Sequence, residues 1–336
     1  MIRSLTSLRG IFILFIFFHH LHLYDGGGTM AVAFFFVLGG FSMTLGYKER
    51  ILKSDFSFRD YITKRCVKFY PLHWLTLLVA VPLVLLSFNW KQIPVFFMNA
   101  SLLQTMIPMP HVYFSYNGVS WYLADTMFFA FVFPFLLKWI VNASSKGKIL
   151  IATFFAVIYA AGAIIIPTNM HHAILYISPY MRLTDFVFGI YLALGYLKLK
   201  EKPINFYSNN LLTQVSVFVL IALLVVESCV LSEDAVLFAP VYWPLVALLI
   251  VLVSLSEVTG GYKWLQNKYL QRLGEFSFTI FLTHQLIIRY TRLILGKILH
   301  FENDIVFVIL TLSLTIVVSI VVEKYILKPI TVLNDN

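Results

Sequence analysis

Long apolar stretches follow one another along almost the whole chain, with short polar segments between them. A helix needs about 20 apolar residues to cross a bilayer. Stretches close to that length lie at residues 8–24, 29–47, 69–88, 120–141, 149–167, 174–197, 211–231, 236–256, 276–296 and 303–325. A further apolar piece at 93–110 is interrupted by prolines and polar residues, which is typical of a half-membrane or interfacial segment. The pattern predicts an all-α polytopic membrane protein with about ten transmembrane helices.

The composition supports the same class. Hydrophobic residues make up 60% of the 336 residues, charged residues make up 12%, and the mean hydropathy is +0.85. Soluble domains average about 45–50% apolar and about 25% charged residues. Residues 1–336 are therefore predicted to form a single membrane-embedded domain with no appended soluble domain. The first apolar run has no small-residue cleavage site after it, so we expect a retained signal-anchor. Cys66 and Cys229 match no metal or redox spacing, and no metal site is predicted.

The distribution of lysine and arginine predicts the orientation of the chain, because these residues concentrate in cytoplasmic segments. The alternate loops hold only Lys91 and Lys297. The opposite side holds seven in 47–68, two at each terminus, and three in each of 138–148, 198–210 and 257–275. Both termini are therefore predicted to be cytoplasmic. The net charge of +9 reflects this bias and does not indicate nucleic acid binding. The seven basic residues of segment 47–68 either reflect only this cytoplasmic preference or also bind an anionic cofactor.

Ionisable residues within apolar spans usually face a bundle interior or a wet cavity. In the first span, Arg9 and His20 are separated by three helical turns plus about 20°, so they share a face about 16 Å apart along the axis. His19 and His22 point about 100° and 200° away from His20. Spacing therefore selects His20 as the partner of Arg9. A histidine suits proton abstraction near neutral pH; the alternative is a packing histidine bonded to a nearby carbonyl.

Two later spans carry further ionisable residues. Arg182 and Asp185 are three residues apart and can pair on one helix face, either for function or only to hold helices together. Ser277 and His284 are seven apart and also share a face, and Arg289 lies further toward the outside. His284 is a second candidate for the cavity, with packing as its alternative.

Seven motifs, in order along nearly the whole chain, together resemble the integral-membrane acyltransferase 3 family. "SLRGIFILFIFFHH" resembles the family's opening Leu-Arg-Gly with a histidine eleven residues after the arginine. "FFFVLGGF" is similar to its phenylalanine-rich segment, with Gly39 in place of the usual serine. The other five are "KRCVKFYPLHW", "SWYLADTMFFAFVFP", "MRLTDFVFG", "LGEFSFTIFLTHQ" and "VVEKYILKP". Each motif alone is weak, whereas the ordered set is specific.

Besides Gly39, three positions depart from the family pattern. Lys68 stands where the family usually has arginine, which keeps the charge and loses the bidentate fork. Asp125 follows Trp121 by four residues where the family acid follows by five, so we do not take Asp125 as its equivalent. Asp185 replaces a glutamate with a shorter acid.

The resemblance implies transfer of an acyl group, most often acetyl, from cytoplasmic acetyl-CoA, a cosubstrate rather than a permanently bound cofactor. The implied acceptor is a carbohydrate hydroxyl, on a cell-surface or lipid-linked glycan, and the implied location is a bacterial inner membrane. Arg9 and His20 are the family's functional pair. We expect His20 to act as a general base or transient acyl carrier, and Arg9, Arg65 and Lys68 to hold the donor.

The same resemblance implies roles for the other ionisable residues. Arg182, fixed by Asp185, is expected to orient His20 or to stabilise developing oxyanion charge. His284, Arg289 and Trp121 are expected on the acceptor side. Two alternatives remain open: a proton-coupled transporter or flippase that uses the same buried Arg, His and Asp groups, and an inactive family member that only binds lipid or proteins.

Overall fold

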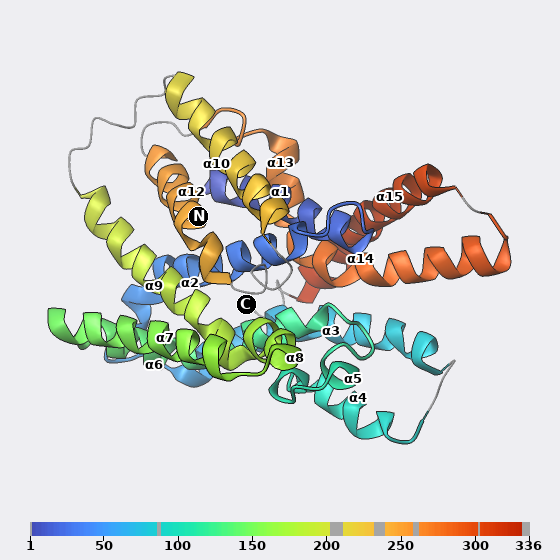
Figure 1. Cartoon of the computed structure of the whole chain (residues 1–336), viewed down its shortest axis with the longest axis horizontal. Coiled ribbons are helices and arrows are strands. Elements are labelled where there is room, and N and C mark those ends of the chain that lie inside the picture. The colour runs from blue at the N-terminus through green and yellow to red at the C-terminus, as the bar shows by residue number, and fades with distance from the viewer. Residues whose placement is uncertain are drawn as a thin grey trace.

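Helices occupy the apolar stretches of the sequence in the computed structural model (Figure 1). The structure describes residues 2–85, 89–201, 211–231, 239–257, 262–301 and 303–330, with the side chains of 211–213 left aside. This part of the chain contains no strand, which confirms the all-α prediction. Residues 86–88 and 236–238, at the ends of two predicted spans, and residues 202–210 and 258–261, in two predicted loops, lie outside it.

Each predicted span corresponds to a helix. These helices are α1 (Arg3–His20), α2 (Gly27–Ile51), α3 (Phe58–Leu85), α6 (Ser120–Asn142), α7 (Ser145–Ile165), α9 (Pro179–Lys200), α10 (Leu211–Val230), α12 (Trp243–Ser256), α14 (Ser277–Arg292) and α15 (Asp304–Val322). In the described residues, six segments are long and apolar enough to cross a membrane: α2, α3, α6, α7, Ala239–Ser256 and Asp304–Ile330. The chain is thus an integral membrane protein by helix length and composition. The count of ten crossings and the cytoplasmic termini stay predictions.

Short helices fill several connections. The predicted interfacial piece 93–110 contains α4 (Gln92–Ala100) and the 3-10 turn η1 (Gln104–Met106), followed by α5 (Pro110–Tyr113). α8 (Thr168–His171) and the π-turn η2 (His172–Ile177) precede α9, and the 3-10 turn η4 (Ala239–Tyr242) precedes α12. α13 (Lys268–Glu275) precedes α14, and the π-turns η6 (Leu293–Ile298) and η7 (Glu323–Leu327) follow α14 and α15.

Two predicted boundaries were wrong. The first helix begins at Arg3 rather than residue 8 and ends at His20, because the backbone at His22 takes a left-handed conformation with φ 57°. The basic segment 47–68 is not one loop, since α2 continues to Ile51 and α3 begins at Phe58. The reason is a buried stripe at helical spacing in the first turns of α3, formed by Tyr61, Arg65 and Phe69.

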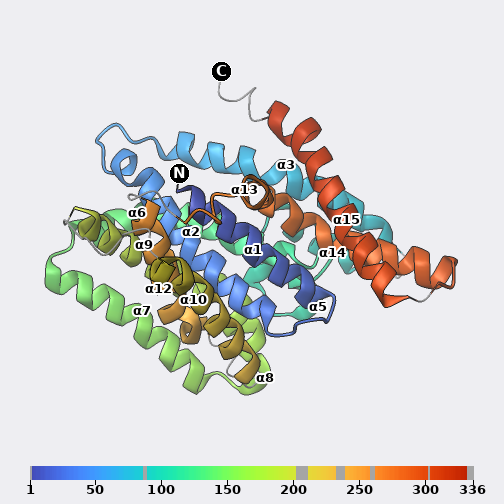
Figure 2. The same ribbon diagram turned by 90° about the horizontal axis from the view of Figure 1, so that it is seen from above.

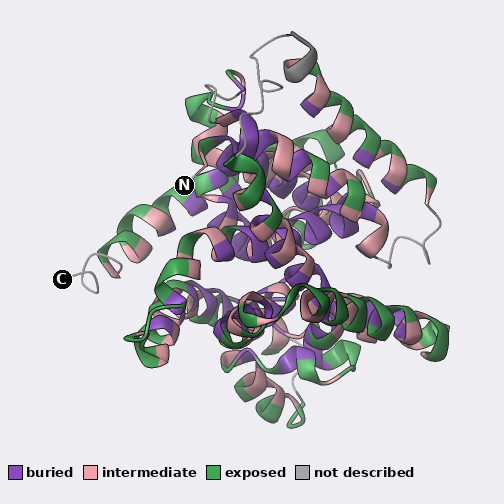
Figure 3. Cartoon of the chain, turned by 90° about the vertical axis from the view of Figure 1, so that its left-hand side faces the viewer, coloured by how far each residue is buried: buried purple, intermediate pink, exposed green. Residues whose placement is uncertain are grey.

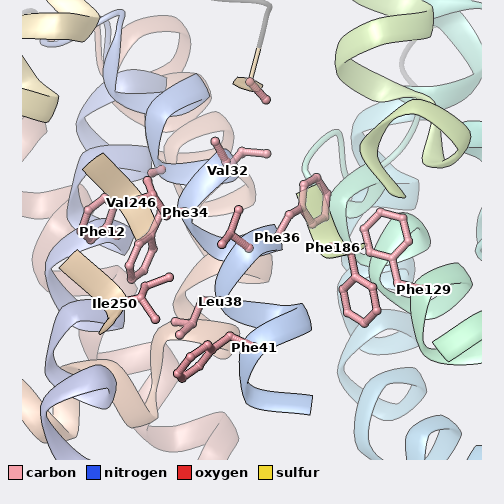
Figure 4. Packing of buried hydrophobic residues seen from close by; sticks show 14 of the residues in the cluster. Phe12, Val32, Phe34, Phe36, Leu38, Phe41, Phe129, Phe186, Val246 and Ile250 are labelled. Carbon is pink, nitrogen blue, oxygen red and sulfur yellow. The ribbon is translucent and has the colours of Figure 1, made fainter. Parts of the chain in front are cut away.

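The core lies around α2, which packs against α1, α6, α9 and α12 (Figures 1 and 2). Phe34 and Phe36 point to opposite sides of α2 (Figure 4). The Phe34 ring stacks on Phe12 at 3.7 Å between centroids, and the Phe36 ring lies 5.1 Å from Phe129. Buried residues gather on these central helices, while exposed residues dominate the outer ones (Figure 3). Many exposed residues of α7 and α15 are apolar, as expected for helices that face lipid.

Glycines allow the closest helix crossings. A side chain at Gly40 of α2 would collide with the backbone of α9 at Phe186, and one at Gly189 of α9 would collide with the backbone of α2 at Val37. Small residues at such crossings let helix backbones approach each other in membranes. This contact holds α9, with Arg182 and Asp185 near its start, firmly against α2.

Candidate active site

α1 is held firmly at its N-terminal end, which fixes the position of Arg9 and His20. The Glu257 carboxylate accepts hydrogen bonds from the backbone N–H of Arg3 (3.2 Å) and of Ser4 (3.3 Å), and from the Ser4 hydroxyl (2.6 Å). A carboxylate here satisfies free N–H groups of the first turn and complements the helix dipole. α13 packs closely on the same helix, where Gly10 faces Gly274.

The structure brings His20 and His284 together, although 264 residues separate them in sequence. The Nδ1 atom of His20 lies 3.3 Å from the Nε2 atom of His284, and the ring centroids are 4.9 Å apart. The contact arises because α1 and α14 lie side by side (Figures 1 and 2). His284 is fully buried, whereas His20 keeps some accessible surface.

The two neighbouring histidines are placed differently. The Nδ1 atom of His19 lies 2.6 Å from the Asp25 carbonyl oxygen, and its ring fills the space beside Gly28 where any side chain would collide. His22 is exposed in the turn after α1, with Nδ1 3.8 Å from a carboxylate oxygen of Asp25. Of the three histidines near the end of α1, only His20 contacts His284 in the described structure.

The three predicted donor-binding residues form a basic cluster, which we define as Arg9, Arg65 and Lys68. Lys68 is close enough to both arginines, and to Glu323 in η7, for electrostatic interaction. The guanidinium of Arg65 lies over the rings of Tyr47 (4.3 Å) and Tyr61 (5.4 Å). The cations of the cluster therefore come from α1 and α3, and the acid beside them, Glu323, comes from η7.

Unpaired donors give the cluster spare capacity for an anion. Arg65 is buried, and its Nε and Nη2 atoms have no hydrogen-bond partner in the described structure. Glu323 is shared with Thr279, whose hydroxyl donates to it at 2.9 Å. Three cations close to a single shared carboxylate leave a net positive site, which suits a polyanionic phosphate ligand.

A series of neighbouring side chains leads from the basic cluster to the histidine pair. Arg9, Tyr122 and His20 each keep some accessible surface, and Lys68 is exposed. Arg9 is close enough to Tyr122 for electrostatic interaction. The Tyr122 ring packs on Phe281 at 4.9 Å, and Phe281 precedes His284 by one helical turn. The series therefore has cations at one end and imidazoles at the other.

Arg182 and Asp185 form the buried pair that their spacing predicts. The Arg182 Nε atom lies 3.2 Å from Asp185 Oδ2, both side chains are fully buried, and Trp243 donates to Asp185 Oδ1 at 2.6 Å. The guanidinium lies over the rings of Phe36 (4.9 Å) and Tyr176 (5.4 Å). Its described contacts do not include His20, so an orienting role for Arg182 would have to be indirect.

The remaining predicted residues, Trp121 and Arg289, are not part of the basic cluster. Trp121 is buried, with its ring 5.2 Å from that of Tyr176. Arg289 donates to the Tyr116 carbonyl oxygen at 2.7 Å. Outside the spans, burial lowers the pKa of His172, whose Nδ1 atom lies 3.3 Å from the Tyr113 hydroxyl. The rings of Trp121, Tyr176, His172 and Tyr113 follow one another in contact, so they form one aromatic group.

Comparison with known proteins identifies the family. The model of a family described as an acyltransferase domain (Acyl_transf_3) matches residues 2–324. The chain belongs to the acyltransferase 3 family. This acyltransferase is also 24% identical over 290 residues to "Acyltransferase MdmB" of Streptomyces mycarofaciens, an alignment that covers 80% of this chain and 70% of that protein. No solved structure matches it.

The sequence missed two features of the acyltransferase site. Tyr122 follows Trp121 in the motif "SWYLADTMFFAFVFP", but the sequence does not indicate that Tyr122 lies between Arg9 and Phe281. The contact between His20 and His284 depends on the packing of α1 against α14. Both histidines sit in family motifs, and that shared membership was the available signal. The described residues contain no group of three or more His, Cys, Asp or Glu side chains suited to hold a metal ion.

Proposed function

We propose that this acyltransferase moves an acyl group, most often acetyl, from acyl-CoA to a hydroxyl group of a carbohydrate. The observation that carries the proposal is the series of side chains that leads from the basic cluster, past Tyr122, to His20. The donor is polyanionic at its nucleotide end and has its thioester at the far end of a long arm. The order of charges along this series matches that order of groups.

The basic cluster would bind the phosphates of the donor. Arg9 keeps some accessible surface, Lys68 is exposed, and the buried Arg65 supplies N–H donors that have no hydrogen-bond partner in the described structure. Charge-assisted hydrogen bonds to phosphate are strong because both partners carry charge. The cluster lies on the side predicted to be cytoplasmic, where acyl-CoA is found.

His20 would then act on the acceptor. As a general base, its imidazole takes the hydroxyl proton while the oxygen attacks the thioester carbonyl carbon; the carbon–sulfur bond breaks, and the thiolate leaves and recovers the proton. As a transient acyl carrier, His20 would itself attack the thioester carbonyl carbon, and the carbon–sulfur bond would break to release the thiolate. The acceptor hydroxyl would then attack the acyl-imidazole, the carbon–nitrogen bond would break to free His20, and the hydroxyl proton would go to the thiolate. Both routes place the reacting carbon beside His20.

The acceptor would approach from the outer side, past Trp121 and Arg289. Carbohydrates present both hydroxyl groups and apolar C–H faces, and an aromatic surround with few charges suits them. Arg182 and Asp185 would support the site from behind the Phe36 and Tyr176 rings. We place the protein in a bacterial inner membrane, in keeping with its family and with the bacterial source of its relative.

The test is thioester cleavage and acyl transfer by the protein purified in detergent. Labelled acetyl-CoA is offered with a panel of sugars and glycolipids, and free thiol and labelled product are measured. Wild type should release thiol and label an acceptor, and His20→Ala should lower the rate by about 10²–10⁴-fold. His19→Ala is the matched control, because His19 is adjacent in sequence and does not contact His284. Substrate-dependent proton movement in proteoliposomes without thiol release would instead favour a transporter.

A further inference from the structure

The surroundings of the histidine pair determine which ring nitrogens carry protons. The Nδ1 atom of His284 lies 2.8 Å from the Phe281 carbonyl oxygen and 3.1 Å from the Ile280 carbonyl oxygen. A carbonyl oxygen can only accept, so His284 Nδ1 must carry a proton and donate it. In the neutral ring, His284 Nε2 then has a lone pair and can only accept.

The same reasoning extends to His20. Its Nδ1 atom faces two acceptors: the Ile16 carbonyl oxygen at 2.9 Å and the Nε2 lone pair of His284 at 3.3 Å. A nitrogen between two acceptors must be the donor. The proton of neutral His20 therefore sits on Nδ1, and the lone pair sits on Nε2.

We infer that His284 is a positioning residue that holds His20 in the Nδ1–H tautomer, which leaves His20 Nε2 as the nitrogen that attacks or takes the proton. This inference rests on the proposed function for its chemical consequence, and on the four distances above for the tautomer itself. It moves His284 from the acceptor side, where the sequence placed it, to a position behind the catalytic ring.

The assignment explains two features of the pair. His284 is fully buried and has both nitrogens engaged, so it offers no free group to a substrate. His20 keeps accessible surface and has one nitrogen beyond the pair. When His20 Nε2 takes the hydroxyl proton, the positive charge is shared with Nδ1–H, and its hydrogen bond to His284 becomes charge-assisted and stronger.

Ring orientation follows from the same contacts. The Ile16 carbonyl belongs to the preceding turn of α1 and moves with His20, so by itself it does not fix the ring relative to the rest of the site. His284 belongs to a different helix. Its Nε2 atom therefore fixes the His20 ring relative to α14, where the rings of Phe281 and Tyr122 pack beside His284.

Two variants at position 284 separate hydrogen bonding from packing. In His284→Gln, the amide oxygen can reach the place of Nε2 and accept from His20; in His284→Met, a side chain of similar length cannot replace that acceptor. We expect His284→Met to lower kcat by about 10–100-fold with KM for acetyl-CoA unchanged. This is less than the ~10⁴-fold loss when a catalytic histidine is left in the wrong tautomer, since the Ile16 carbonyl remains.

The glutamine variant should recover most of the lost kcat. His73→Gln is the matched control, because His73 is equally buried in α3, its Nε2 lies 2.7 Å from the Asn99 carbonyl oxygen, and it lies outside the site. It should keep the wild-type kcat for each folded molecule. Equal kcat in His284→Met and wild type would overturn the inference, and so would equal losses in the methionine and glutamine variants.

A spectroscopic reading tests the tautomer without any activity. Nitrogen-15 NMR of protein labelled at histidine distinguishes protonated from unprotonated ring nitrogens, and His20→Ala identifies the His20 signals. We expect wild-type His20 to carry its proton on Nδ1 and His284→Met to show a mixture of tautomers. A proton on Nε2 in wild type would overturn the inference. Absence of acyl transfer with the Nδ1–H tautomer present would count against the proposed function alone.

Discussion

The buried pair of Arg182 and Asp185 gives a prediction whose size follows from its surroundings. Asp185→Leu removes the partner of the guanidinium and the acceptor for Trp243. Both charged side chains are fully buried, so the guanidinium that remains cannot turn to water. Removing one partner of a buried ion pair destabilises a protein by about 3–5 kcal/mol.

A double variant isolates the unpaired charge. In Arg182→Met/Asp185→Leu, no charge is left buried, and replacing a buried pair by apolar residues is often neutral or stabilising. Stability should therefore return most of the way to wild type, although the Trp243 N–H loses its acceptor at about 1–3 kcal/mol. The double variant also keeps an apolar side chain against the Phe36 and Tyr176 rings.

The measurement is thermal or denaturant unfolding of purified protein in one detergent, followed by acyl transfer per folded molecule. We expect stability to decrease in the order wild type, double variant, single variant. A single variant as stable as wild type would refute the burial argument. Full activity in the folded double variant would show that Arg182 serves stability only, whereas loss of activity would keep it in the proposed chemistry.

Three other predictions use controls from the same elements. Lys68→Met should raise KM for acetyl-CoA about 10–100-fold through the loss of a charged contact. Lys64→Met, at an exposed lysine one turn earlier in α3 and outside the basic cluster, should leave KM unchanged; equal effects would contradict the basic cluster. Gly189→Ala should destabilise the α2–α9 crossing by about 1–3 kcal/mol, while Gly195→Ala, which meets open space in the same helix, should not, as unfolding midpoints can show. Trp121→Leu should raise KM for the acceptor and not for acetyl-CoA, and the reverse pattern in steady-state kinetics would refute its placement.

Local patterns in the sequence predicted much of the fold. Apolar runs of membrane length gave a helix for every predicted span, and the i, i+3 spacing of Arg182 and Asp185 gave their pairing, because neighbours on one helix are fixed by helix geometry alone. The boundaries were less predictable. The Phe58 start of α3 depends on the burial of Tyr61 and Arg65 against other helices, which composition does not reveal.

The sequence predicted the individual residues of the candidate site but not the contacts between them across different helices. Spacing within one helix placed Arg9 and His20 on a common face. The contact of His20 with His284, and the electrostatic interaction of Lys68 with Glu323, join segments more than 250 residues apart. Such interactions depend on which helices pack together. For the same reason, the sequence indicates the acceptor side for His284, whereas in the structure His284 lies against His20.

The central claim is that the basic cluster binds the acyl donor and that the donor's thioester reaches His20. Acetyl-CoA binding measured by calorimetry on wild type, Arg9→Ala and His20→Ala tests it most directly. The account predicts that wild type binds, that Arg9→Ala binds at least about tenfold more weakly, and that His20→Ala binds as wild type does without cleaving the thioester. No binding by wild type at millimolar acetyl-CoA, or equal binding by the Arg9 variant, would contradict it.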